Sequence, residues 1–146
     1  MARPAQQPSH RDGDEPRKRA RFGYVAGYST IDNARLEALA AAAELTDREF
    51  RVLMWFVGAS PGPNQPVMQT TGQIAKRLGT SPDALGRIER KLVRRRLLFV
   101  AEEFGRQKFY KVSSYFASQE EALGQRSTIR AYNPPDIPGL DTRPGL

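Results

Sequence analysis

The residues best suited to a chemical role are basic side chains on one face of an expected helix. Between Lys76 and Arg96 the chain carries eight Lys or Arg residues and only two acidic ones. Four of these bases recur at offsets of three and four, which places them on one side of a helix: Arg87, Arg90, Lys91 and Arg94. An ordinary solvated helix face mixes both charge signs, so this imbalance indicates an anionic partner such as a phosphate backbone.

Local signals predict the helix that would carry these bases. Ser81 suits the N-cap position, and Pro82 suits the first helical position, where its missing N–H costs nothing. An apolar stripe at helical spacing lies on the opposite face and must therefore meet a core. That stripe comprises Leu85, Ile88 and Leu92.

A shorter helix is expected just before it. Thr70 and Gln73 have the spacing of a capping box, which marks a helix start. Gly79 follows the apolar positions of this segment and suits the left-handed exit of a helix. Two helices joined by a short turn of this kind predict a helix-turn-helix.

Two segments beyond the second helix predict a β-hairpin. Leu98–Ala101 and Lys108–Val112 are rich in β-branched and aromatic residues, and Gly105 lies in the polar stretch between them. A hairpin in this place would form a wing beside the two helices. The expected fold class is therefore mainly α with a small β-hairpin, an α+β winged helix-turn-helix.

The stretch TTGQIAKRLGTSPDALGRIERKLVRRRLLFV resembles the winged helix-turn-helix core of MarR-like regulators and of RepL-type plasmid replication initiators. The family pattern is matched by an Ala in the first of the two helices, a turn Gly and an apolar triad in the second: Ala75, Gly79, Leu85, Ile88 and Leu92. The resemblance extends from about Leu45 to Val112 and is specific for fold more than for biological role.

Two positions depart from the family pattern. Glu89 stands where the family usually has a buried Leu, and we expect it to be a partly exposed ion-pair partner outside the core. Arg96 stands where Gly usually closes the helix. A left-handed conformation at Arg96 would carry a modest strain, because its Cβ crowds the following carbonyl group.

The pattern and the resemblance together predict a set of residues that contact DNA. Arg87 is the best placed to pair with guanine O6 and N7 in the major groove. Arg106, at the tip of the hairpin, is expected to reach a phosphate or an A·T-rich minor groove; otherwise it is a solvated turn residue. The whole expected set is Thr70, Thr71, Gln73, Thr80, Ser81, Asp83, Ala84, Gly86, Arg87, Arg90, Lys91, Arg94, Arg106 and Lys108.

These residues predict a sequence-specific protein that binds double-stranded DNA, with transcriptional control as its biological use. One alternative is a plasmid replication initiator that marks origin DNA. Another is a winged-helix module that binds protein and never touches nucleic acid. We expect neither an enzyme nor a cofactor.

Composition supports a nucleic-acid partner. The formal net charge is +7 and the isoelectric point is near 10.1. Between Lys76 and Lys111 there are eleven Lys or Arg and four acidic residues, so this one region accounts for the whole charge balance. The chain has no Cys and one His, at position 10, so thiolate metal sites are excluded and His-based catalysis is not expected.

No apolar run approaches the roughly 18 residues that a membrane span needs, and the amino terminus lacks the apolar core of a secretory signal. We expect a cytoplasmic, nucleoid-associated protein without a membrane partner. The abundance of Arg and Ala is compatible with a bacterial source.

Composition also divides the chain into three parts. We expect residues 1–21 to be a disordered arm, whose basic end could follow a DNA groove. Residues 22–131 should form the winged-helix domain with its flanking helices. Residues 132–146 should be a disordered Pro-rich tail. A helix over Asp32–Glu44 is expected to pack in the domain or to serve a possible homodimer.

Four further elements are expected inside the domain. A weak strand is predicted over Phe22–Ser29. The family resemblance implies a short strand over Pro66–Thr70 that pairs with the wing. A helix capped by Thr46 would bury one stripe of apolar side chains, and a last helix would run from Ser118 to about Ala131. The buried stripe of the Thr46 helix is predicted to be Phe50, Leu53, Met54 and Val57.

Overall fold

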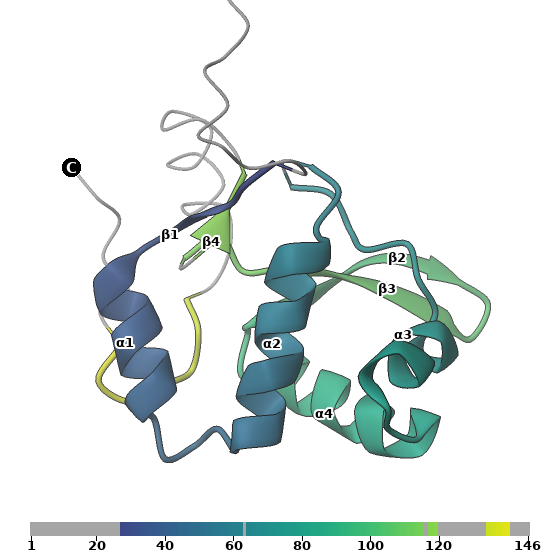
Figure 1. Cartoon of the computed structure of the whole chain (residues 1–146), viewed down its shortest axis with the longest axis horizontal. Coiled ribbons are helices and arrows are strands. Elements are labelled where there is room, and N and C mark those ends of the chain that lie inside the picture. The colour runs from purple at the N-terminus through teal and green to yellow at the C-terminus, as the bar shows by residue number, and fades with distance from the viewer. Residues whose placement is uncertain (1–26, 63, 116, 120–133, 141–146) are drawn as a thin grey trace, which may run out of the picture.

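The structure is a computed structural model that describes residues 27–62, 64–115, 117–119 and 134–140. The described chain is a mixed α+β fold, as expected, and its elements follow one another as in Figure 1. They are β1 (Thr30–Ile31), α1 (Asn33–Ala41), α2 (Asp47–Ala59), α3 (Thr71–Leu78), α4 (Pro82–Arg94), β2 (Leu98–Phe104), β3 (Gln107–Val112) and β4 (Ala117–Ser118). The expected arm over 1–21 and nearly all of the expected helix after Ser118 lie outside the described residues.

Each helix begins at a side chain that caps it. The Oδ1 atom of Asp32 accepts a hydrogen bond from the backbone N–H of Arg35, and Thr46, Thr70 and Ser81 do the same for α2, α3 and α4. These caps satisfy N–H groups that the first helical turn leaves without a partner. Gly79 ends α3 at a φ of 70°, in the left-handed region that glycine tolerates. The starts of the four helices in the described part of the chain are therefore those that the sequence predicts.

The strands form two small antiparallel sheets. In the first, β2 pairs with β3 from Leu98↔Val112 to Phe104↔Gln107, and a bulge falls between Val100 and Glu102. Gly105 takes a φ of 60° in the tight turn between these strands. In the second, β1 pairs with β4, which brings the two ends of the domain together (Figure 1).

The core lies where α2 meets α4 and β3. Figure 1 shows α2 at the centre, with α1 on one side and the α3–α4 pair on the other. The ring of Phe56 on α2 meets the ring of Tyr110 on β3 edge to face, with centroids 6.1 Å apart. The apolar residues with no measurable exposure are Leu53, Phe56, Ile74, Ala75, Leu85, Leu92, Leu97 and Leu98.

Several boundaries differ from the sequence-based prediction. Residues 27–29 are not in a strand, and β1 begins only at Thr30. The first helix ends at Ala41 and not at Glu44, because the backbone turns at Ala42 so that Leu45 can enter the core. Ser118, expected to begin a helix, lies in β4 and pairs with Thr30.

The buried stripe of α2 also differs. Leu53 and Val57 are buried as predicted, but Val52 and Phe56 complete the stripe while Phe50 and Met54 are only half-buried. The expected Pro66–Thr70 strand is reduced to one bridge, in which the N–H of Val67 donates to the carbonyl of Tyr110 at 2.9 Å.

The expectation of a disordered tail over 132–146 is wrong for residues 134–140. Ile137 and Leu140 are buried in the core, at 5% and 9% exposure. The N–H of Asp136 donates to the carbonyl of Arg95 at 2.8 Å, and Arg96 Nε donates to the carbonyl of Pro134 at 2.6 Å. Carbonyl groups at the end of a helix need donors, and this segment supplies one. Figure 1 shows it in yellow beside α1.

Candidate functional site

A groove lies between the start of α3, α4 and the turn of the β2–β3 hairpin. Its volume is about 570 Å³. Three elements meet there because α4 packs on α3 and the hairpin folds back beside them. The groove is lined by Thr70, Thr71, Gly72, Pro82, Asp83, Gly86, Arg87, Glu89, Arg90, Arg106, Gln107, Lys108 and Tyr110.

Eight of the fourteen residues predicted to contact DNA line this groove: Thr70, Thr71, Asp83, Gly86, Arg87, Arg90, Arg106 and Lys108. The other six do not line it: Gln73, Thr80, Ser81, Ala84, Lys91 and Arg94. Of these six, Gln73 and Ser81 serve as capping residues of α3 and α4.

Positive charge dominates the groove. Arg87 and Arg90 come from α4, Arg106 from the hairpin turn and Lys108 from the start of β3, and all four side chains are exposed. The acids that line the groove are Asp83, at its rim, and Glu89, which is buried. Four cations that converge from α4 and the β2–β3 hairpin make a surface that attracts polyanions.

Gly86 shapes the α4 side of the groove. A Cβ atom at this position would lie 3.3 Å from Nη1 of Arg90, which is tighter than ordinary van der Waals contact. The guanidinium group of Arg90 therefore lies over the bare backbone of the preceding turn. This arrangement holds the Arg90 head close to the helix surface that lines the groove.

The start of α3 forms the opposite edge. The Thr70 hydroxyl accepts from the N–H of Gln73 at 3.2 Å, and Gln73 Oε1 accepts from the N–H of Thr70 at 2.9 Å. This capping box fixes the first turn of α3. Thr70, Thr71 and Gly72 of that turn line the groove, so the positive end of the α3 dipole lies at its edge.

Glu89 lies in the floor of the groove, and the expectation of a partly exposed ion-pair partner is wrong. Its side chain is only 1% exposed, and its Oε1 accepts a hydrogen bond from the Thr71 hydroxyl at 2.7 Å. The position faces inward because α4 turns this side toward α3 and β3. Burial raises the pKa of the Glu89 carboxyl above its ordinary value, although the Thr71 hydrogen bond and the charge of Arg90 oppose the change.

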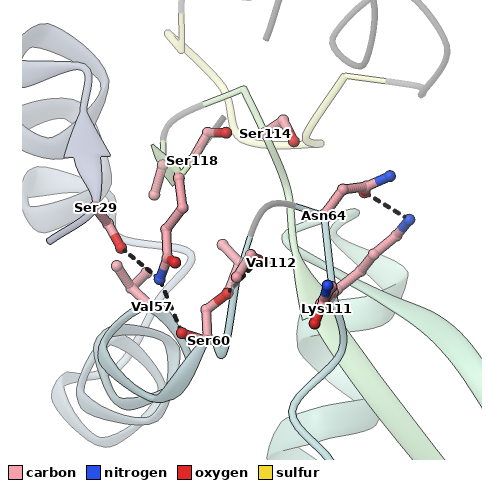
Figure 2. Close-up of a pocket in the computed structure, with 12 residues that line it drawn as sticks. Ser29, Val57, Ser60, Asn64, Lys111, Val112, Ser114 and Ser118 are labelled. Carbon is pink, nitrogen blue, oxygen red and sulfur yellow. Dashed lines mark hydrogen bonds between the residues drawn. The ribbon is translucent and has the colours of Figure 1, made fainter. Parts of the chain in front are cut away.

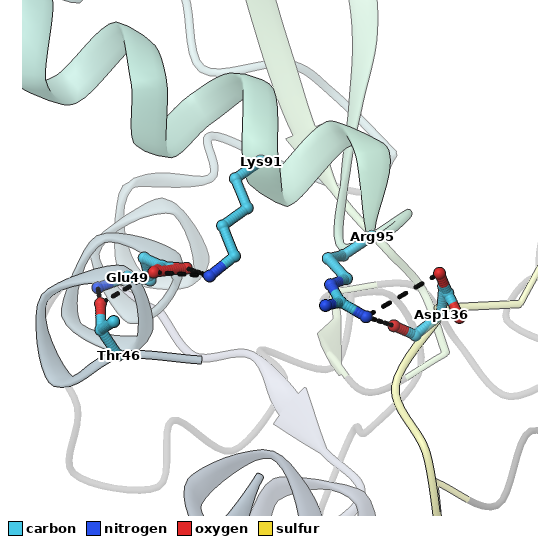
Figure 3. Close-up of polar contacts among 5 residues, drawn as sticks. All are labelled: Thr46, Glu49, Lys91, Arg95 and Asp136. Atoms are coloured by element: carbon cyan, nitrogen blue, oxygen red, sulfur yellow. Dashed lines mark hydrogen bonds and ion pairs between the residues drawn. The ribbon is translucent and has the colours of Figure 1, made fainter. Parts of the chain in front are cut away.

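Lys91, predicted to contact DNA, faces α2 and not the groove. Its Nζ lies 2.6 Å from Oε2 of Glu49, whose Oε1 also accepts a hydrogen bond from Thr46, as Figure 3 shows. Burial alone would raise the pKa of Glu49. The hydrogen bonds from Lys91 and Thr46, together with the positive charge of Lys91, bring that pKa below its ordinary value. Lys91 thus serves an internal ion pair.

The structure adds residues to the groove that sequence reasoning missed: Gly72, Pro82, Glu89, Gln107 and Tyr110. Gly72 and Pro82 sit in the first turns of α3 and α4, so the predicted helix starts contained the signal for both. Tyr110 lines the groove because β3 passes beneath it. Predicting this contact would have required the register of the β2–β3 hairpin.

A second, much smaller hollow lies at the end of α2, near β1 and β4 (Figure 2). Gln119 Nε2 donates to the Ser29 hydroxyl at 3.3 Å and to the Ser60 carbonyl at 2.8 Å, and Lys111 Nζ donates to Asn64 Oδ1 at 2.9 Å. Its volume of about 30 Å³ has room for about one water molecule. The Gln119 contacts tie the end of β4 to the segment before β1 and to the end of α2, and the Lys111 contact ties β3 to the loop that follows α2.

The described residues contain no cluster of His, Asp or Glu that could hold a metal ion. In the same part of the chain, no helix has the length and apolar character needed to cross a membrane. No model of a known protein family matches this chain, and no curated protein matches its sequence. The charge and shape of the groove therefore carry the functional inference.

Proposed function

We propose that residues 70–112 form a winged helix-turn-helix that binds double-stranded DNA sequence-specifically and serves as a bacterial transcriptional regulator. The observation that carries the proposal is the convergence of Arg87, Arg90, Arg106 and Lys108 on one groove beside the start of α3. The major groove of B-DNA admits an α-helix. On α4, the side chains of Asp83, Arg87 and Arg90 are exposed.

The elements then have distinct roles. Arg87 lies toward the amino-terminal end of α4, which is the end that meets base edges in helix-turn-helix docking, so it reads guanine. Arg94, at the other end of α4 and exposed, contacts phosphate and positions the helix. The β2–β3 turn places Arg106 where the backbone or the neighbouring minor groove passes.

Binding to DNA at a series of salt concentrations tests the proposal. If the exposed basic residues of α4 and the β2–β3 hairpin together neutralise about five phosphates, a plot of log K against log salt should have a slope of roughly −4 to −5. A slope near zero would leave the groove without a DNA ligand and favour a protein partner.

A charge-matched control separates the groove from net charge. Arg90→Ala with Lys108→Ala, which removes two groove cations not assigned to base reading, should reduce the slope by about two. Arg48→Ala with Arg51→Ala removes the same charge from exposed positions of α2, outside the groove, and should leave the slope nearly unchanged. Equal losses in the two double variants would show that only overall charge matters.

Selection of bound sequences from a random duplex pool tests specificity. A defined consensus is expected, and a palindromic one would indicate a homodimer. If the recovered duplexes share no consensus, the protein binds DNA without sequence specificity.

A further inference from the structure

Glu89 is an unusual residue for the floor of a groove that attracts polyanions. The side chain is 1% exposed, and Thr71 donates a hydrogen bond to Oε1 at 2.7 Å. Among the described residues, none gives Oε2 a hydrogen bond. If the Glu89 carboxylate is ionised, only one of its two oxygens accepts a hydrogen bond, and a buried charge with so little compensation is energetically costly.

The groups around Glu89 offer it limited compensation. Arg90 on α4 is the cation whose charge acts on it, and it is exposed at the groove surface. Thr71 on α3 is neutral, and Tyr110 on β3 is buried, with a pKa that burial and the charge of Glu89 both raise. The other charged groups that line the groove are Arg87, Arg106, Lys108 and Asp83.

DNA in this groove would change both the charge and the solvation around the Glu89 carboxyl group. Phosphates add negative charge above the floor and exclude water, and both changes disfavour an ionised Glu89. Phosphates also pair with Arg90, which reduces its compensation of Glu89. A neutral carboxyl group removes the repulsion and still accepts the Thr71 hydrogen bond.

On the basis of the proposed DNA-binding function, we propose that Glu89 takes up one proton from solvent when DNA fills the groove, so that affinity for DNA falls as pH rises. The proton binds Oε2, while Oε1 continues to accept from Thr71. Glu89 is thus a positioning residue that holds the first residue of α3 at the groove edge and links that edge to pH.

The experiment measures affinity for a labelled 30-base-pair duplex of mixed sequence, at fixed ionic strength, across the acidic and neutral pH range. For the wild-type protein, K should fall with rising pH by up to about tenfold per unit where bound and free protein differ by one proton. Glu89→Gln is nearly isosteric and keeps an acceptor for Thr71, so it should hold the low-pH affinity throughout. Glu37→Gln, at an exposed position of α1 outside the groove, is the matched control and should keep the wild-type profile.

Calorimetry in buffers of different ionisation enthalpy counts the protons directly. Wild-type protein should take up more protons than Glu89→Gln on binding the duplex, by up to one. His10 is present in both proteins, so any contribution from it cancels. Equal proton uptake and parallel pH profiles would overturn the inference.

A second variant decides the matter even if Glu89→Gln does not fold. Thr71→Val removes the hydrogen bond that favours the ionised carboxylate, so the fall in affinity should move to higher pH. A loss of affinity that is equal at every pH would instead show a structural role for Thr71 and contradict the proton linkage. A wild-type salt slope near zero would overturn the DNA proposal itself, whereas a normal slope with unshifted profiles overturns only the linkage.

Discussion

Lys91 on α4 and Glu49 on α2 form an ion pair, with Nζ and Oε2 2.6 Å apart, that joins the candidate DNA-reading helix to the central helix of the core. The Glu49 side chain is almost fully buried, and the Lys91 side chain is about one-third exposed. Figure 3 shows the pair beside a second link, in which Arg95 Nη1 donates to the carbonyl of Asp136 at 3.1 Å. The basic residues of α4 and its end are thus divided between the groove and the interior of the domain.

Lys91→Ala should destabilise the fold without a specific effect on DNA binding. The substitution leaves the buried Glu49 carboxylate without its cation, at a cost of about 1 to 3 kcal/mol in the free energy of unfolding. Chemical denaturation at neutral pH measures the loss. Lys91→Ala combined with Glu49→Gln should recover part of the stability, and an unchanged midpoint in the single variant would mean that the pair contributes nothing.

The same pair predicts a pH dependence of stability. Because the folded pKa of Glu49 lies below the ordinary value of 4.5, its stabilising contribution is present above that value and is lost as pH falls through the folded pKa. The difference in unfolding free energy between wild type and Glu49→Gln should therefore shrink on acidification. A constant difference across this range would contradict the assignment.

For Glu89 the pH dependence of stability should have the opposite sign to that for Glu49. The folded protein binds the Glu89 proton more tightly than the unfolded chain, so wild-type stability falls as pH rises above 4.5 and until the raised folded pKa is passed. The slope for this one group cannot exceed about 1.4 kcal/mol per pH unit. Denaturation at several pH values should show Glu89→Gln gaining on the wild type, and parallel curves would refute the prediction.

Arg87→Ala and Arg94→Ala should separate base reading from phosphate contact. Loss of Arg87 should cost about 1 to 3 kcal/mol on the preferred sequence and relax the preference at one position. Loss of Arg94 should weaken binding to specific and random duplexes alike. Fluorescence anisotropy with both duplexes measures the two ratios, and equal losses for Arg87→Ala would make it a phosphate contact only.

Gly86→Ala should raise stability and lower DNA affinity. Alanine favours the helix over glycine by about 1 kcal/mol. The added Cβ would meet Arg90 Nη1 at 3.3 Å, so the guanidinium group must move from its place over the backbone. Denaturation and anisotropy on the same samples test the two effects. In the Arg90→Ala background, Gly86→Ala should no longer reduce affinity, and a persisting loss would point to direct crowding of DNA.

Arg106→Ala tests where the hairpin turn meets DNA. Gly105 and Arg106 form the turn that closes the Phe104↔Gln107 pair, and the Arg106 side chain is exposed there. A minor-groove contact predicts a larger loss of affinity when the flanks of a fixed site are A·T-rich than when they are G·C-rich. Equal losses would leave a phosphate contact, and no loss on either site would confine the interface to α3 and α4.

The sequence predicted most of what depends on neighbouring residues. The caps of all four helices, the left-handed Gly79 and the Gly105 turn each follow from a few adjacent side chains. Arg96 also takes the left-handed conformation considered from the family comparison, at a φ of 56°. These features require no knowledge of how the elements pack.

Features that depend on distant residues were missed. Lys91 and Arg90 are adjacent and chemically alike, yet α2 lies on the Lys91 side of α4 and supplies Glu49, so Lys91 forms an ion pair within the domain. Glu89 was expected outside the core because a charged residue is seldom buried, but Thr71 supplies the hydrogen bond that permits it. The burial of Ile137 and Leu140 could not be read from a Pro-rich composition.

The packing of residues 134–140 has a consequence for synthesis on the ribosome. Leu140 shares a core with Leu39, which is translated much earlier, and Asp136 binds the end of α4. The growing chain can therefore form α2, α3 and α4 while part of their apolar surface waits for residues that have not yet emerged. During this interval the nascent domain presents a surface to which chaperones bind, and a translational pause between Val112 and Leu140 would prolong its exposure.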